Sequence, residues 1–284
     1  MILSTDLAVA YMQEREMDSG ADVRFFRPCD ALRPYVRYFY VLKVNGSLRT
    51  LTFPLGCPQM IVHKGTPLYI PELDVRQSKF TVSGQVNFPA HVCSEGGTEM
   101  IVAVFYPHTS GLFTDVPMSL LYNREISGHD LENRALDGLV ARVSECGDNR
   151  HCVRMIEKWM IAKLRHMQGG NIGRIGAAVR KVLEAPSASV EELASTACLG
   201  RKQFGRVFGD MVGMMPKGYA RVVRFQRALW LMQMGERDGA GLAYGAGYAD
   251  QSHLIREFRM FSGCTPRQLT EVCEPYSDLF CCPV

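Results

Sequence analysis

The sequence predicts an α+β protein with a β-rich amino-terminal half and an all-α carboxyl-terminal half. At 284 residues the chain is long enough for about two domains. Short aromatic and β-branched runs divided by Gly and Pro occupy residues 35–106, whereas apolar residues recur at helical spacing from residue 129 onward. In addition, one segment of the carboxyl-terminal half occurs twice in tandem.

The amino-terminal residues bear on the expected location of the protein. Ile2 and Leu3 are followed by charged residues from Asp6 onward, which is not the pattern of a secretory signal. No apolar run reaches the length of about 18 residues that a membrane-spanning helix needs. We therefore expect a cytoplasmic protein that does not bind a membrane.

Four runs in the first half predict β-strands, at residues 35–42, 60–63, 80–84 and 100–106. Several short strands separated by Gly and Pro favour a barrel or a sandwich. The aromatic run at 35–42 could line a ligand pocket, and alternating core packing explains it equally well.

Residues 129–167 predict two amphipathic helices that form an αα-hairpin. The first helix carries an apolar stripe through Leu136, Leu139 and Val143, and the second carries one through Val153, Ile156 and Met160, with a break at 147–148. Such a hairpin can pack against its own domain, against a second copy, or against both. The segment 168–171 is a predicted hinge.

The later copy of the tandem segment predicts a helix, a tight turn and a second helix. Gly247 can end the first helix, and Asp250 can cap the second by accepting from free N–H groups. Leu254 and Phe258 recur at helical spacing and face inward. The opposite face carries side chains that can bind base edges and phosphates, namely Gln251, Ser252, His253 and Arg256. The alternative is an ordinary amphipathic helix with a polar outer face.

The earlier copy lies roughly fifty residues upstream and shares the same landmarks. Phe204 corresponds to Leu254, and Phe208 corresponds to Phe258; Gly213 and Pro216 correspond to Gly263 and Pro266. Its outward side chains are Arg201, Lys202, Gln203 and Arg206. The approach to the later copy contains Gly239, Gly241 and Gly245, each costing a helix about 1 kcal/mol relative to Ala, so we expect a short or loose helix there.

These two units, with the apolar helix expected at 220–232 between them, resemble the DNA-binding domain of the AraC/XylS family of transcription regulators over residues 172–272. The resemblance implies two helix-turn-helix units joined by a long helix, with their recognition helices in major-groove segments about 34 Å apart. Arg221, Arg224 and Arg227 on the joining helix could contact phosphate or solvate the helix, and we expect at least one phosphate contact. The amino-terminal half resembles, more weakly, the cupin-like barrel sensor domains of that family.

This resemblance divides the chain into a sensor or dimerisation domain at 1–168, a DNA-binding domain at 169–272 and a Cys-containing tail at 273–284. Within the first domain we expect the barrel at about 22–126 and the αα-hairpin at about 129–167. Residues 171–270 hold 14 Lys and Arg against 8 Asp and Glu, whereas residues 1–170 hold 18 of each, which suits a nucleic-acid module joined to a neutral domain. The implied partners are double-stranded DNA, RNA polymerase, a small-molecule effector and a second copy bound through 129–167. The implied role is that of an activator.

A cupin barrel can hold a metal, but the usual pair of histidines one residue apart is missing. His63, His91 and His108 are scattered, and Glu95 follows His91 without a partner histidine. A site assembled in space stays open, yet we expect hydrogen-bonded or surface histidines and neither a metal nor a cofactor. No Ser/His/Asp constellation or phosphate-binding loop indicates an enzyme, so we expect none.

Ten cysteines are many for a cytoplasmic regulator. No C-x-x-C pair occurs, so we expect most to be small buried side chains, with Cys198 and Cys264 at packing positions. The adjacent Cys281 and Cys282 are the exception, because exposed thiols there could bind a soft metal or sense oxidants. A thiol- or metal-responsive regulator is therefore the alternative hypothesis.

Overall fold

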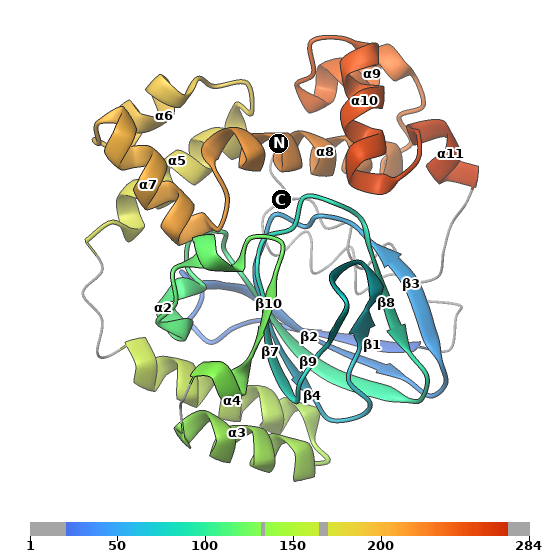
Figure 1. The fold of residues 1–284 in the computed structure, drawn as a ribbon, viewed down its shortest axis with the longest axis vertical. Coiled ribbons are helices and arrows are strands. Elements are labelled where there is room, and N and C mark those ends of the chain that lie inside the picture. The colour runs from blue at the N-terminus through green and yellow to red at the C-terminus, as the bar shows by residue number, and fades with distance from the viewer. Residues whose placement is uncertain (1–20, 132–133, 165–169, 272–284) are drawn as a thin grey trace.

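Two antiparallel sheets form the amino-terminal domain of the structure, a computed structural model that describes residues 21–131, 134–164 and 170–271 (Figure 1). The six-stranded sheet has the order β1-β2-β9-β4-β7-β10, and the four-stranded sheet has the order β3-β8-β5-β6. The strands are β1 (Ala21–Phe26), β2 (Val36–Val44), β3 (Leu48–Thr52), β4 (Gln59–His63), β5 (Tyr69–Ile70), β6 (Val75–Arg76), β7 (Phe80–Ser83), β8 (Ala90–Ser94), β9 (Thr98–Phe105) and β10 (Glu125–Ser127).

All four predicted strands are present, and the α+β class is confirmed. The closed cupin-like barrel is not confirmed, because the described strands form two separate sheets. The central strand β9 pairs with β2 on one side and β4 on the other, and its residues 100–105 are all buried. Burial on both faces explains why this run is almost continuously apolar rather than alternating.

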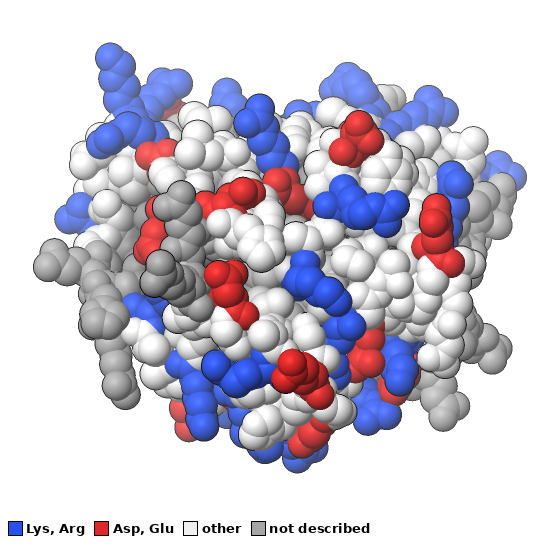
Figure 2. Space-filling view, turned by 60° about the horizontal axis from the view of Figure 1, so that its bottom comes forward, with Lys and Arg blue, Asp and Glu red and all other residues white. Residues whose placement is uncertain are grey.

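The predicted αα-hairpin forms as α3 (Arg134–Glu145) and α4 (Asn149–Leu164) and lies at the far end of the domain from the carboxyl-terminal helices (Figure 1). Its apolar stripe joins the core of the six-stranded sheet, in which Leu139, Val143, Ile156 and Met160 pack with strand residues. The surface around this end mixes basic and acidic side chains without a patch of one sign (Figure 2). Short elements between β9 and α3 in the chain are α2 (Gly111–Thr114) and the 3-10 turns η2 (Met118–Leu121) and η3 (Gly128–Leu131), and a further 3-10 turn, η1 (Pro71–Leu73), links β5 to β6.

The carboxyl-terminal domain is entirely helical in its described part. Its helices are α5 (Ile172–Glu184), α6 (Val190–Thr196), α7 (Arg201–Val212), α8 (Pro216–Gln233), α9 (Gly239–Ala246), α10 (Gln251–Ser262) and α11 (Pro266–Glu271). The long helix α8 runs between the group α5–α7 and the group α9–α11, as Figure 1 shows. Phe225 lies at its centre with its ring 5.1 Å from that of Phe258 and 5.2 Å from that of Phe261.

The loop that follows β3 packs against the helical domain. Phe53 is buried in the core of the helical domain, with its ring edge-on to Phe225 at 6.0 Å. Next to it, Gln226 Nε2 donates a hydrogen bond of 2.6 Å to the Pro54 carbonyl, and the Gln226 side chain is fully buried. The long helix α8 of the carboxyl-terminal domain is therefore in direct contact with the amino-terminal domain.

Candidate nucleic-acid interface

The first unit consists of α6 and α7. Ser189 begins α6 with a capping box, in which its hydroxyl accepts from the Glu192 amide and the Glu192 carboxylate accepts from the Ser189 amide. Phe204 and Phe208 of α7 are fully buried. The opposite face of α7 exposes Arg201, Lys202, Gln203 and Arg206.

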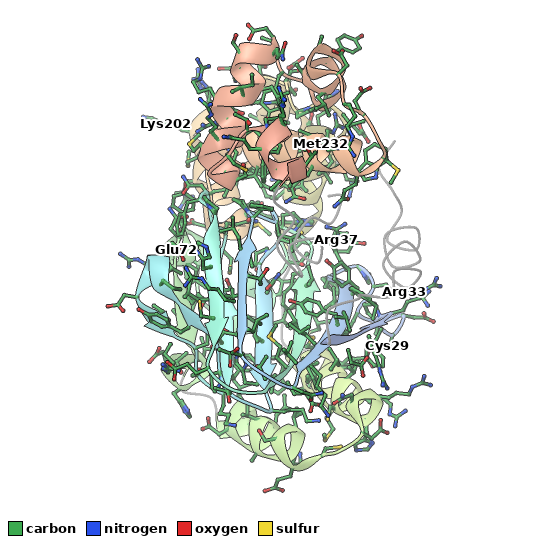
Figure 3. All side chains as sticks on the ribbon, turned by 90° about the vertical axis from the view of Figure 1, so that its right-hand side faces the viewer. Cys29, Arg33, Arg37, Glu72, Lys202 and Met232 are labelled. Carbon is green, nitrogen blue, oxygen red and sulfur yellow. The ribbon has the colours of Figure 1, made fainter. Side chains whose placement is uncertain are left out.

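Two of these side chains show how accessible that face is. Lys202 projects from the helical layer, away from the sheets (Figure 3). Arg201 forms an ion pair of 2.6 Å with Glu191, but the two side chains are 72% and 60% exposed. An exposed pair of this kind contributes little stability, so Arg201 can exchange Glu191 for a nucleic-acid group at small cost.

The second unit consists of α9 and α10. The glycine-rich α9 forms over eight residues, as short as predicted, and is capped by Asp238, whose carboxylate accepts from the Gly241 amide at 2.6 Å. Gly247, with a φ of 88°, ends α9 as expected. Asp250 then caps α10 by accepting from the His253 amide at 2.7 Å. Leu254 and Phe258 are buried, as predicted.

On the outer face of α10, Gln251, Ser252 and Arg256 are exposed, whereas His253 is only partly exposed. Its Nε2 lies 3.3 Å from Glu257 Oε1, and its ring packs edge-on against Tyr248 with the centroids 5.2 Å apart. The side chain of His253 is 27% exposed. The structure thus gives His253 an intramolecular position that the helical spacing does not reveal.

The three arginines of α8 are bound within the protein. Arg221 Nε donates to Glu257 Oε1 at 2.7 Å, and Arg224 Nη2 donates to both Glu257 oxygens at 3.2 and 3.3 Å. Arg224 Nη1 also donates to the Pro186 carbonyl at 3.2 Å. Arg227 Nη2 donates to the carbonyls of residues 183 and 184, at the carboxyl-terminal end of α5. These side chains hold α8 to its neighbours, and the expected phosphate contact stays a prediction.

Glu257 is the residue of this domain that the sequence analysis missed. Its side chain is 7% exposed and accepts from Arg221 and Arg224, with His253 beside it. The sequence does indicate that Glu257 is buried, because a residue between Leu254 and Phe258 stands at an inward-facing helical position. A buried carboxylate needs cationic partners, and Arg221 and Arg224, which are 36 and 33 residues away in the sequence, supply them.

Comparisons with known proteins agree with this geometry. Residues 193–271 match the family model of a helix-turn-helix domain, and residues 24–127 match a domain of unknown function, DUF6597. The chain carries an AraC-type helix-turn-helix domain at its carboxyl terminus. An uncharacterized HTH-type transcriptional regulator of Haemophilus influenzae is 24% identical over 156 residues, which are 54% of this chain and 50% of that protein.

Two further likenesses are more limited. The RCS-specific HTH-type transcriptional activator RclR of Escherichia coli is 32% identical over 100 residues, which are 34% of this chain and 35% of RclR. The crystal structure of ToxT from Vibrio cholerae O395 aligns with a TM-score of 0.43 at 11% identity, covering 88% of this chain and 96% of ToxT. The curated relatives are thus matched over half of their length or less.

Outside the AraC-type domain, the structure separates the three histidines considered as metal ligands. His63 Nε2 lies 2.7 Å from Gln77 Oε1, and burial lowers the pKa of His63 to about 4. His91 pairs with Glu72, Nδ1 to Oε1, at 2.6 Å. His108 lies against Gly176 of α5, where burial and the nearby Arg180 lower the pKa of the imidazole to about 4. Within the described ranges no group of three metal-binding side chains occurs, and no described helix is long and apolar enough to span a membrane.

The prediction that most cysteines are buried is wrong for those the structure describes. Of the seven, only Cys57 and Cys152 are buried, whereas Cys198 is exposed. Cys198 occupies the turn between α6 and α7 with a φ of 51°, which points its side chain to solvent rather than into a packing position. Cys281 and Cys282 lie outside the described residues, so the thiol-based alternative stays a hypothesis.

Proposed function

We propose that this chain is a sequence-specific DNA-binding regulator of transcription. The observation that carries the proposal is the tandem arrangement of two helix-turn-helix units, each with an apolar pair buried in the domain core and polar side chains exposed on the opposite face of its second helix. The matched relatives are named as HTH-type transcriptional regulators, which supports the same class and gives no support to an enzyme.

In this proposal α7 and α10 enter the major groove. Arg201 and Arg206 suit guanine, and Gln203 and Gln251 suit adenine, because these pairings are bidentate. Lys202, Ser252 and Arg256 suit phosphates or single base acceptors. His253 contributes the exposed part of its ring, held in place by Glu257.

We further propose that the amino-terminal domain senses a small molecule and passes the signal through the loop after β3. Phe53 and Leu55 line the cavity between the two sheets, and Phe53 and Pro54 contact α8. A change in this loop on ligand binding would therefore act directly on the helix that sets the spacing of the two recognition helices. A cytoplasmic location belongs to the same proposal, because the DNA-reading domain must share a compartment with its DNA.

The roles implied by the resemblance alone stay predictions. Activation through RNA polymerase is one of them. Dimerisation through 129–167 is another, and among the described residues of α3 and α4 no large apolar side chain is strongly exposed. A dimer formed there would bury a mixed-charge surface rather than an apolar one, and its affinity would depend on salt.

The test begins with selection of preferred sites from a randomised duplex pool by the purified full-length chain. Arg201→Ala should then weaken binding to the selected site by about 1–3 kcal/mol, the contribution of one bidentate base contact. Arg174→Ala is the control, because Arg174 is also exposed but lies on α5. Equal losses for the two variants would contradict the assignment of α7 as the first recognition helix.

A further inference from the structure

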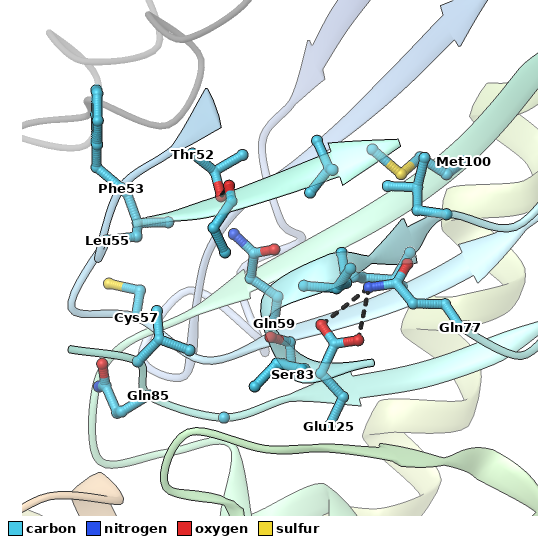
Figure 4. Close-up of a pocket in the computed structure, with 18 of the residues that line it drawn as sticks. Thr52, Phe53, Leu55, Cys57, Gln59, Gln77, Ser83, Gln85, Met100 and Glu125 are labelled. Atoms are coloured by element: carbon cyan, nitrogen blue, oxygen red, sulfur yellow. Dashed lines mark hydrogen bonds between the residues drawn. The ribbon is translucent and has the colours of Figure 1, made fainter. Parts of the chain in front are cut away.

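A cavity of about 90 Å³ lies between the two sheets of the amino-terminal domain (Figure 4). This volume limits an occupant to a small molecule. Much of the wall is apolar, and its buried side chains include Ile61, Leu68, Ile70, Val92 and Met100.

The chemically distinctive group of the wall is the carboxylate of Glu125 on β10. Gln77 Nε2 donates to both Glu125 oxygens at 2.9 Å (Figure 4). Behind it, Gln77 Oε1 faces His63 Nε2 at 2.7 Å. Since Gln77 Oε1 can only accept, His63 carries its proton on Nε2.

His63 does not neutralise Glu125. Burial lowers the pKa of His63 to about 4, so the imidazole is uncharged at neutral pH. None of the described residues that line the cavity is Lys, Arg or His. Burial also raises the pKa of Glu125, as expected for a carboxylate that has hydrogen bonds but no cation beside it.

We propose that this cavity binds a small organic cation, a primary ammonium or an amidinium, whose N–H groups bind Glu125 while its carbon stem packs against the apolar wall. The cation would supply the missing opposite charge, and the apolar wall would favour a short alkyl group. An anion would meet the Glu125 charge, with the Gln77 amide already engaged. The inference rests on the proposed sensor role of this domain and names its ligand class.

The first test uses the wild-type full-length chain and three probes of equal length, namely n-butylammonium, 1-butanol and butyrate. A ligand that binds only the folded state raises the melting temperature by mass action. We expect a concentration-dependent rise with n-butylammonium, a smaller rise with 1-butanol and none with butyrate. No rise with the ammonium, or an equal rise with the alcohol or the carboxylate, overturns the proposal.

The second test asks whether the charge of Glu125 is responsible for binding. Glu125→Gln keeps the shape of the side chain but removes its charge, and should lower n-butylammonium affinity about ten- to hundredfold, as titration calorimetry measures. Glu95→Gln is the control, because Glu95 is an exposed carboxylate of the same domain and does not line the cavity. An unchanged affinity in Glu125→Gln overturns the proposal, and if that variant does not fold, the wild-type probe series still decides it.

The same samples distinguish this inference from the proposed regulator function. DNA binding of the ligand-free protein to its selected site tests the regulator function without any probe. Ammonium binding to a chain that does not bind DNA would leave the cavity assignment standing and remove the regulator. DNA binding without ammonium binding would support the regulator function and overturn the cavity assignment.

Discussion

Glu257 offers the sharpest test of how the AraC-type domain is held together. Its side chain is 7% exposed and joins α10 to α8 through Arg224, which is 13% exposed, and Arg221, which is 37% exposed. Glu257→Gln removes the charge while leaving an amide oxygen that can still accept hydrogen bonds. Arg224 would then stay buried without its anionic partner.

Breaking a buried pair in this way costs about 3–5 kcal/mol. Because Gln retains one acceptor and Arg221 is partly solvated, we expect the lower end, about 3 kcal/mol. Glu191→Gln is the matched control. Its partner Arg201 lies at 2.6 Å, as close as Arg221 lies to Glu257, but both side chains of that pair are more than half exposed. Its loss should therefore stay below about 1 kcal/mol.

The assay is urea unfolding at pH 7, with the free energy of unfolding obtained by linear extrapolation. Trp230 lies on α8, so its fluorescence in a Trp159→Phe background reports on this domain rather than on the hairpin. A loss in Glu257→Gln no larger than that in Glu191→Gln would refute the reasoning, because burial would then not distinguish the two ion pairs. A double-mutant cycle with Arg224→Gln should give a coupling energy above about 1 kcal/mol.

Three further predictions concern the protonation of His63, the packing around Gly84 and the helix cap formed by Asp238. The folded-state pKa of His63 is about 4 against an ordinary value of 6.5, so the unfolded state binds more protons between these values and stability falls as pH falls through that window. From pH 7 to pH 5 this amounts to about 2 kcal/mol in urea titrations, and a His63→Gln variant with the same pH slope would contradict it. Gly84→Ala would place a Cβ 2.0 Å from the Leu121 carbonyl oxygen, so thermal unfolding should show a loss of at least about 3 kcal/mol; an unchanged melting temperature would contradict the packing described. Asp238→Ala removes the cap of a glycine-rich helix, costing about 1 kcal/mol, and faster amide hydrogen exchange confined to α9 is the expected signature.

Much of the AraC-type domain could be predicted because its signals are local. Gly213, Gly247 and Gly263 all adopt the left-handed conformation that ends a helix, and Asp250 caps α10, which begins at the next residue. The same holds for the α3–α4 hairpin, whose apolar spacing requires only the helical period. Strands were harder to predict. β3 and β8 pair with each other in the smaller sheet, but their mixed polar and apolar residues lack the continuous apolar run of β9.

By itself, the sequence determined the two-domain division, the tandem units, and the face of α7 and α10 that remains polar, because periodicity and capping act within a few residues of chain. Only the tertiary structure decided which charged side chains are free to bind another molecule and which are engaged within the protein. Arg221 and Glu257 are 36 residues apart, and Gln226 and Pro54 are 172 apart, so their hydrogen bonds exist only once helices and domains have packed. The same packing places Glu125 beside Gln77 in the wall of the cavity, with His63 behind Gln77. Whether a polar side chain binds DNA, a ligand or its own protein depends on what folding brings within hydrogen-bonding distance, and the residue's neighbours in sequence do not specify it.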